Sequence, residues 1–272
     1  MFKDILVVLE GNPAAAEFAL SFAGRFAAEV TAVCAKGDFV VDAAAAAQTR
    51  YAFILAGRPQ TSQTALASLA AFDALARQAG IAAHTGPLED LEAEEINDAP
   101  RFARSFDLVM LEQPAPGRPR AHGAPIASLL AESGRPVLVT PYIHKGPASF
   151  ERVLVAWDAS ASAARALADA MPILEQAGAI EVVTVTRPRP GEETPRGASV
   201  LRHLARRGIE ATFRAIPSDI DIGNMLLSHV ADSDADLLVA GGYGHSRLTE
   251  SILGGVTRTL LESMTIPVFM SH

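Results

Sequence analysis

The residues best suited to bind a ligand lie near the end of the chain, in two short glycine-rich groups. Residues 241–244 read Gly-Gly-Tyr-Gly, nine residues follow, and residues 254–257 read Gly-Gly-Val-Thr. An apolar run at 236–240 predicts a buried strand before them, and apolar residues at helical spacing come after. Glycine lets a ligand approach the backbone, and a helix start offers unpaired N–H groups with a positive dipole end. The order strand, loop, helix therefore indicates a phosphate-binding loop; a loop in which glycine only permits the turns is the alternative.

The elements that would position this loop occur twice along the chain. A predicted strand ends just before Glu10 in the first half and just before Asp158 in the second, and an alanine-rich helix follows each. The predicted strands are residues 5–9, 30–35, 81–85, 106–111 and 135–139, then 153–157, 180–186, 209–216, 235–240 and 266–270. Strands alternating with helices indicate parallel pairing and right-handed crossovers. We therefore expect an α/β protein with two tandem doubly wound domains, each built on a five-stranded parallel sheet.

The boundary between the halves is expected at residues 141–149, where the apolar pattern stops and proline and glycine collect. This predicts domains at residues 1–142 and 151–272. Aligned on each other, the first half is about 17 residues longer inside than the second. The expected place for the extra loop and helix is residues 36–63.

The glycine spacing resembles the nucleotide loop of the universal stress protein family. The resemblance includes Gly244-His245-Ser246, the helix that follows residue 254 and the closing strand at 266–270. The tandem repeat resembles the two-domain members of that family over essentially the whole chain. The resemblance implies a strand order of 3-2-1-4-5 in each domain and ATP or another adenine nucleotide, with Mg²⁺, as the ligand. It also implies self-association or pairing of the two domains.

The ligand is expected where the strand order reverses, between the first and fourth strands of the second half. By the resemblance, Asp158 contacts the nucleoside end of ATP and Val185 offers backbone contacts to the base. An Asx turn or a helix cap is the alternative role of Asp158, and a solvated loop is the alternative for His245 and Ser246. The predicted nucleotide-binding residues are Asp158, Val185, Gly241, Gly244, His245, Ser246, Gly254, Gly255, Val256 and Thr257.

Two features of the sequence depart from the family pattern. Gly255 stands where ATP-binding members usually have Ser or Thr, so we expect binding to be weakened but not abolished, because the backbone N–H groups of residues 254–256 remain. In the first half, the corresponding loop at 112–124 lacks the first two glycines, contains three prolines and begins with Glu112, which would repel phosphate. We therefore expect this half to have lost the phosphate-binding loop and to serve a structural or regulatory role.

Composition and missing motifs exclude several classes of protein. A net charge of −8 argues against non-specific binding of nucleic acid or anionic membranes. The single cysteine, Cys34, rules out a disulfide framework, and with no leader-like or membrane-spanning segment in the sequence we expect a cytoplasmic protein. Neither a Gly-x-x-x-x-Gly-Lys-Ser/Thr loop, nor a Gly-x-Ser-x-Gly elbow, nor metal-type spacing of His and Cys occurs.

Two functions remain. The first is a stress-response protein that binds an adenine nucleotide in its second domain, without a catalytic residue or metal site of its own and with at most slow ATP hydrolysis. The second is a nucleotide-free module for protein interaction and signalling, in which both loops are purely structural.

Overall fold

The computed structural model describes residues 1–9, 12–34, 63–85, 99–113, 123–186, 197–242 and 254–272; for residues 63–66 and 123–125 only the backbone is described. The chain divides into two compact units, Met1–Ala148 and Ser149–His272. The extra loop and helix predicted at 36–63 lie outside the described residues, apart from Gln63, which begins a helix. Within the described ranges, no helix has both the length and the apolar character needed to cross a membrane.

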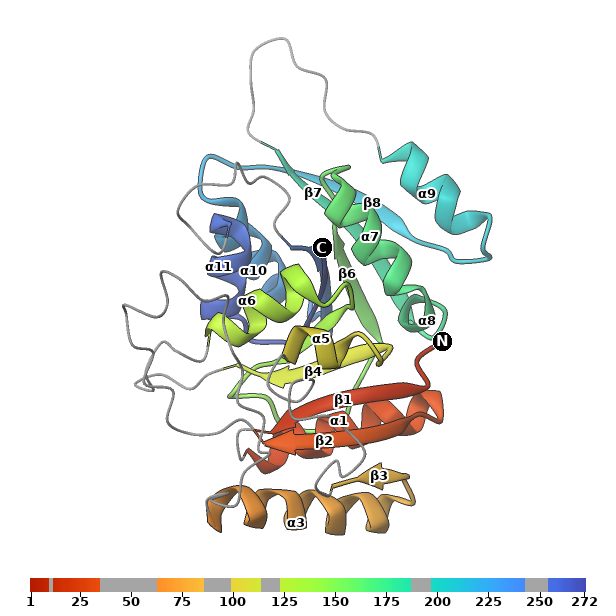
Figure 1. Cartoon of the computed structure of the whole chain (residues 1–272). Helices are drawn as coiled ribbons and strands as arrows, with labels where there is room; N and C mark the ends of the chain where they lie inside the picture. Colours follow the sequence, from red (N-terminus) through yellow and green to blue (C-terminus); the bar gives the residue numbers. More distant parts are fainter. Residues whose placement is uncertain (10–11, 35–62, 86–98, 114–122, 187–196, 243–253) are drawn as a thin grey trace, which may run out of the picture. The chain divides into compact units, whose positions relative to one another are not determined.

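The first unit is a five-stranded parallel sheet with helices on both faces. Its elements, in chain order, are β1 (Asp4–Leu9), α1 (Pro13–Phe26), β2 (Glu29–Cys34), α3 (Gln63–Ala79), β3 (Ala83–His84), α5 (Ala99–Ala103), β4 (Leu108–Glu112), α6 (Gly123–Glu132) and β5 (Val137–Thr140). The strand order is β3-β2-β1-β4-β5, and all pairs are parallel (Figure 1).

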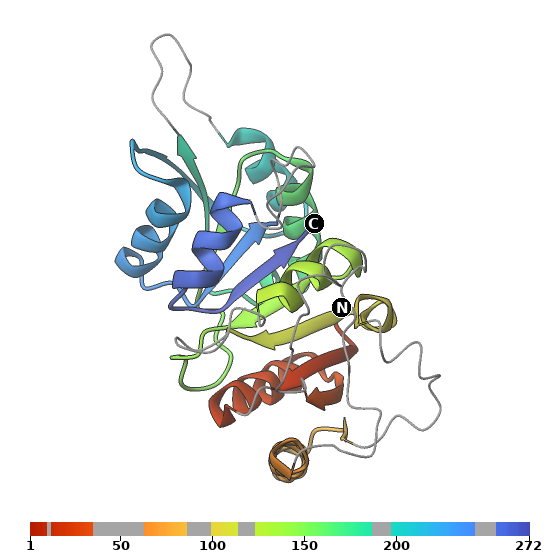
Figure 2. The same cartoon turned by 60° about the vertical axis from the view of Figure 1, so that its left-hand side comes forward.

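Local sequence accounts for the first helix of this unit. Asn12 caps α1 by accepting the N–H of Ala14, and Pro13 occupies the first helical position, where no N–H is needed. Phe18 and Phe22 lie one turn apart on the buried side. The same helix packs against α3, which Figure 2 shows almost end-on. An aromatic stripe thus fixes α1 on the sheet.

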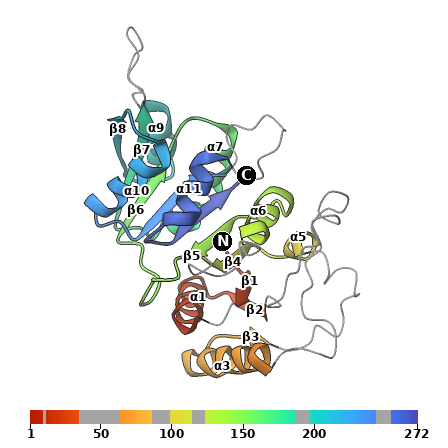
Figure 3. The ribbon, with the colours of Figure 1, turned by 90° about the vertical axis from the view of Figure 1, so that its left-hand side faces the viewer.

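The second unit repeats this architecture. Its elements are β6 (Arg152–Ala156), α7 (Ala161–Asp169), α8 (Met171–Leu174), β7 (Ala179–Thr186), α9 (Ala198–Ala205), β8 (Thr212–Pro217), α10 (Ile222–Asp232), β9 (Leu237–Gly241), α11 (Gly255–Ser263) and β10 (Val268–Ser271). The strand order is β10-β9-β6-β7-β8, again all parallel. The right-handed crossovers put α7, α8 and α9 on one face and α10 and α11 on the other (Figure 3).

The central strands of the second unit are buried on both faces, as their unbroken apolar runs predict. Val153 to Val155 of β6 and Leu237 to Ala240 of β9 are all buried. Helices α10 and α11 lie against each other, and Gly223 permits this approach, since a Cβ there would lie 2.7 Å from Cβ of Thr259. In each unit the strand order is 3-2-1-4-5 when strands are numbered within the unit, so the predicted fold class is confirmed.

Candidate functional site

A cavity of about 320 Å³ opens at the carboxyl edge of the second sheet, where the ends of β6 and β9 diverge at the reversal of strand order. This is where ligands of open parallel sheets bind. The volume lies at the lower end of the range for small-molecule sites. The described lining residues are Ala156, Trp157, Asp158, Ser160, Ser162, Ala163, Val183, Val185, Ile222, Leu226, Ala240, Gly241, Gly254, Gly255, Val256 and Thr257.

The cavity brings together predicted residues that lie far apart in the sequence. Asp158, Val185, Gly241, Gly254, Gly255, Val256 and Thr257 all line it. The other three predicted residues, Gly244, His245 and Ser246, lie outside the described residues. Four chain segments therefore meet at one edge of the sheet: the end of β6, the end of β7, the end of β9 and the start of α11.

The start of α7 forms one wall of the cavity and is capped by its own side chains. Oδ1 of Asp158 accepts the N–H of Ser160 at 2.9 Å, which makes an Asx turn. The helix cap itself is Ser160, whose hydroxyl accepts the N–H of Ala163 at 3.1 Å. Ala159, between them, has a φ of 61°, in the left-handed region. The alternative structural role of Asp158 is thus present, and its exposed carboxylate remains at the mouth of the cavity.

The start of α11 also lines the cavity, and its N-cap residue has no side chain with which to cap the helix. Gly254 is the N-cap residue, and the first intrahelical hydrogen bond runs from the N–H of Arg258 to its carbonyl at 2.9 Å. Asp, Asn, Ser and Thr usually occupy such a position, because their oxygens accept the first N–H groups of the helix. With glycine there, the first turn presents backbone donors and the positive end of the helix dipole to the cavity.

The described residues do not require Gly254 and Gly255 to be glycine. A Cβ at either position would meet no described atom within 4 Å, and Gly254 has a φ of −61°, which any residue adopts. Gly241 differs: a Cβ there would lie 2.5 Å from the backbone nitrogen of Ala163 and 2.8 Å from Oγ of Ser162. Gly241 therefore lets α7 approach β9, whereas Gly254 and Gly255 leave open space beside the helix start.

Several lining residues were not predicted from the sequence. Trp157, the only tryptophan of the chain, stands directly before Asp158. Its position at the end of the predicted strand 153–157 is enough to place it at the same edge of the sheet as Asp158. Ile222 and Leu226 come from one side of α10. With Val183, they make much of the wall apolar. These two residues reach the cavity because α10 packs beside α11, and no local sequence pattern predicts that packing.

At the equivalent edge of the first unit, the end of the fourth strand carries a buried glutamate. Glu112, the last residue of β4, matches Gly241 in the strand register, because Leu108 pairs with β1 as Leu237 pairs with β6. Its side chain is buried, and Oε1 accepts the N–H of Asn12 at the start of α1, at 3.2 Å. A space of only about 10 Å³ remains beside it among the described residues. The carboxylate of Glu112 would disfavour a phosphate at this strand end, while residues 114–122 of the loop on which the prediction rests lie outside the described residues.

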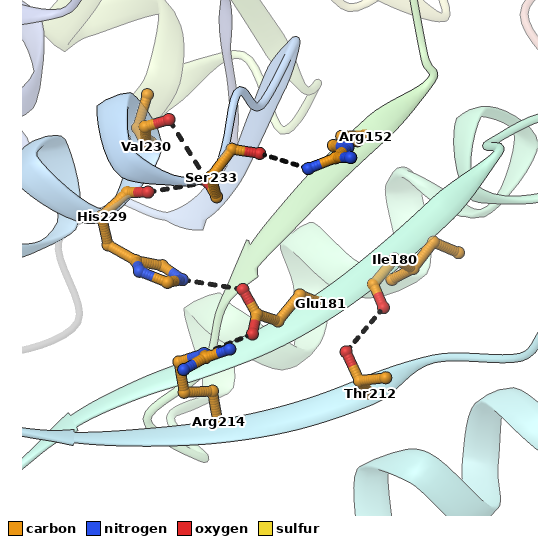
Figure 4. A network of polar contacts seen from close by, with 8 residues as sticks. All are labelled: Arg152, Ile180, Glu181, Thr212, Arg214, His229, Val230 and Ser233. Carbon is orange, nitrogen blue, oxygen red and sulfur yellow. Dashed lines mark hydrogen bonds and ion pairs between the residues drawn. The ribbon is translucent and has the colours of Figure 1, made fainter.

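A second polar cluster lies at the amino end of the second sheet, away from the cavity (Figure 4). Oε1 of Glu181 accepts from Nε of Arg214 at 2.6 Å, and Oε2 lies 2.7 Å from Nε2 of His229. Partial burial raises the pKa of Glu181, but the hydrogen bonds from Arg214 and His229 outweigh it, so the pKa lies below its usual value. The cluster ties β7 to β8 and α10. No group of acids, His and Cys suited to hold a metal ion occurs among the described residues.

Comparison with known proteins bears directly on the second unit. Residues 149–272 match the model of the universal stress protein family. The second half of this chain belongs to the universal stress protein family. The family match thus begins where the second unit begins and contains the whole cavity.

Solved structures extend the likeness to the whole chain. A universal stress protein from Archaeoglobus fulgidus DSM 4304 is 16% identical, with a TM-score of 0.66 over 98% of this chain and 97% of that one. A putative universal stress protein from Pseudomonas aeruginosa UCBPP-PA14 is also 16% identical, with a TM-score of 0.61 over 99% and 93%. At this identity the likeness shows the fold, and it shows that the fold of tandem universal stress protein units covers both halves. No curated protein matches the chain.

Proposed function

We propose that the universal stress protein domain of the second half binds ATP or another adenine nucleotide, as part of a stress response. One observation carries this proposal: the start of α11, whose N-cap residue is Gly254, lies on a cavity at the sheet's switch point, and a Cβ at Gly254 or Gly255 would meet no described atom within 4 Å. The backbone N–H groups of a helix start and the helix dipole favour a phosphate group there.

The opposite part of the cavity suits the nucleoside. Val183, Val185 and Leu226 offer apolar surface for a base, and Trp157 adds an aromatic ring. Asp158 lines the same cavity, where its carboxylate is suited to accept hydrogen bonds from ribose hydroxyls. Mg²⁺ would arrive with the phosphates of ATP, as it commonly does at nucleotide sites.

The proposal is for a binding protein that does not turn over its ligand quickly. Asp158 is the only ionisable side chain among the described lining residues, and one of its oxygens already accepts the N–H of Ser160. A general base needs a free proton-accepting group within reach of the attacking water. We therefore expect hydrolysis of ATP to be slow or absent. A cytoplasmic setting, and self-association or pairing of the two domains, remain part of the same proposal.

Trp157 provides the test, because it is the sole tryptophan and lines the cavity. Titration of Mg-ATP into the full chain should change its tryptophan fluorescence saturably. Gly254→Val, which places a branched side chain at the helix start, should weaken binding at least tenfold while the protein stays folded, because the space there is open. The matched control is Ala198→Val at the exposed first position of α9, outside the cavity, which should bind as the unaltered protein does.

A saturable signal that Gly254→Val leaves unchanged would move the ligand away from α11. No signal at millimolar ATP, ADP, AMP or cAMP would instead favour the alternative, a nucleotide-free interaction module whose glycines serve only the fold.

A further inference from the structure

Helix α9 carries an exposed group of basic residues that plays no part in the proposed nucleotide site. Arg202 and His203 lie in its last turn, and Arg206 and Arg207 follow directly. All four side chains are exposed. We call these four residues the α9 cationic face. In the sequence it stands out because the whole chain has 23 Lys and Arg against 31 Asp and Glu.

The arginines of this face differ from the others in the described part of the chain. The guanidinium groups of Arg202, Arg206 and Arg207 have no hydrogen bond or ion pair there, although the backbone groups of these residues take part in the helix and its cap. Every other described arginine has an interaction within the chain. Arg77, Arg165, Arg214 and Arg258 pair with carboxylates, Arg25, Arg104, Arg135 and Arg152 donate to backbone carbonyls, and Arg101 also has a partner. The α9 cationic face is thus the place where the described part leaves its guanidinium groups unused.

The arrangement is unfavourable for the isolated protein. Arg202 and Arg206 are four residues apart, so two guanidinium groups are neighbours along the helix surface, and Arg207 follows directly. The helix dipole offsets part of this repulsion, since cations are favoured at a C-terminus. A neighbouring carboxylate would offset it further, yet Glu210, close in sequence, makes no ion pair with any of them among the described contacts.

The surroundings of the face decide what kind of anion it fits. Val200 and Leu204, the apolar residues of α9, are buried against the unit's core, and no large apolar side chain of α9 is exposed. A membrane-binding helix would instead present an apolar face. None of the described cavities includes the four residues, which favours an extended anion over a single phosphate held in a pocket. The chain's net charge of −8 opposes a long polyanion such as nucleic acid, which needs many phosphate contacts, more than it opposes a short acidic segment held by one local group of cations.

We propose that the α9 cationic face docks a carboxylate-rich segment of a partner protein. Guanidinium groups match carboxylates with two parallel hydrogen bonds, and residues spread over two helical turns suit several side chains of a peptide better than one compact ion. Because the pairs are solvent-exposed, the docking is weak and sensitive to salt, with a dissociation constant on the order of a millimolar for an isolated short peptide.

The test uses the full chain and three probes: an octapeptide of glutamate, a thymidine octanucleotide, and phosphatidylserine vesicles. Backbone amide shifts in NMR spectra should show the peptide at α9 in 50 mM salt and its release at 300 mM. The variant Arg202→Ala/Arg206→Ala/Arg207→Ala should lose at least tenfold in peptide affinity. The control Arg77→Ala/Arg165→Ala/Arg258→Ala removes an equal number of positive charges, from exposed positions that pair with carboxylates. Its affinity for the peptide should fall less than twofold.

A third variant separates charge from shape. Lysine at all three α9 positions keeps the charge without the planar fork, so it should bind the peptide more weakly than arginine and more tightly than alanine. Equal losses in the alanine variant and the control would overturn the proposal, because they would reflect bulk charge only. It would likewise be overturned if the oligonucleotide or the vesicles bound α9 while the peptide did not, or if no probe shifted α9 amides.

Discussion

At the scale of single residues, Gly254 and Gly255 are the most informative part of the molecule, because none of the described residues requires them to be glycine. A Cβ at either position would meet no described atom within 4 Å, and the N-cap residue of the helix has no side chain. Gly241 and Gly223, by contrast, are held as glycine by backbone or side-chain atoms less than 3 Å from their Cβ positions. Glycine thus serves packing at positions 223 and 241, and at positions 254 and 255 it leaves room for a ligand.

Gly255→Ser is expected to tighten ATP binding. A hydroxyl at position 255 adds a hydrogen bond to a charged phosphate. Such a bond typically contributes about 1.5–3 kcal/mol to the binding free energy, which is roughly tenfold or more in affinity. Its Cβ has room, so the fold should not change. Fluorescence titration of this variant against Gly255→Ala, which adds the Cβ alone, checks the prediction; equal affinities in the two variants would show that no phosphate lies at this position.

Glu181→Gln is expected to lower stability near neutral pH. Partial burial opposes ionisation of Glu181, but the hydrogen bonds from Arg214 and His229 bring its folded-state pKa below the usual value of 4.5. A depressed carboxylate pKa contributes stability that is present above about 4.5 and is lost as pH falls through the folded pKa. Urea unfolding from pH 7 to pH 3 should therefore show a gap between variant and parent that closes on acidification. A gap that is constant with pH would contradict the role given to the ionised group.

At the scale of elements, the site depends on how closely helices approach strand ends. The start of α7 lies against the end of β9, and α11 lies against α10. The cavity is what remains between α7 and α11 at the edge of the sheet. In the first unit the corresponding strand end carries Glu112, whose carboxylate accepts the N–H of Asn12 at the start of α1. Among the described residues, the two units therefore differ in whether a side chain stands at the end of the fourth strand.

Two alanine substitutions should separate the glycines that serve packing from those that face the cavity. Gly241→Ala inserts a methyl group 2.5 Å from a backbone nitrogen and should cost about 1–3 kcal/mol of unfolding free energy. Gly254→Ala meets nothing within 4 Å and should leave stability within about 0.5 kcal/mol of the parent. Chemical denaturation of both proteins measures the difference. Equal destabilisation would mean that α11 begins in a more crowded setting than the structure has it.

At the scale of the whole molecule, the fold followed from the sequence because buried parallel strands are unbroken apolar runs. All ten predicted strands are present, with ends shifted by up to three residues. Part of the candidate site could be predicted from the sequence, because ligands of open parallel sheets bind where the strand order reverses, and the strand order alone says which strand ends meet there. Seven predicted residues line the cavity. What the sequence did not reveal depends on tertiary packing: Ile222 and Leu226 reach the cavity only through the position of α10, and the burial of Glu112 depends on α1.

We propose that each chain binds one adenine nucleotide, in its second half. Calorimetric titration of Mg-ATP into the protein tests this proposal most directly, because calorimetry measures stoichiometry. We expect saturation near one nucleotide per chain, since a buried glutamate, Glu112, stands at the strand end of the first unit where the second unit has Gly241 beside a cavity. Two nucleotides per chain, or no heat of binding at millimolar ATP, would contradict it.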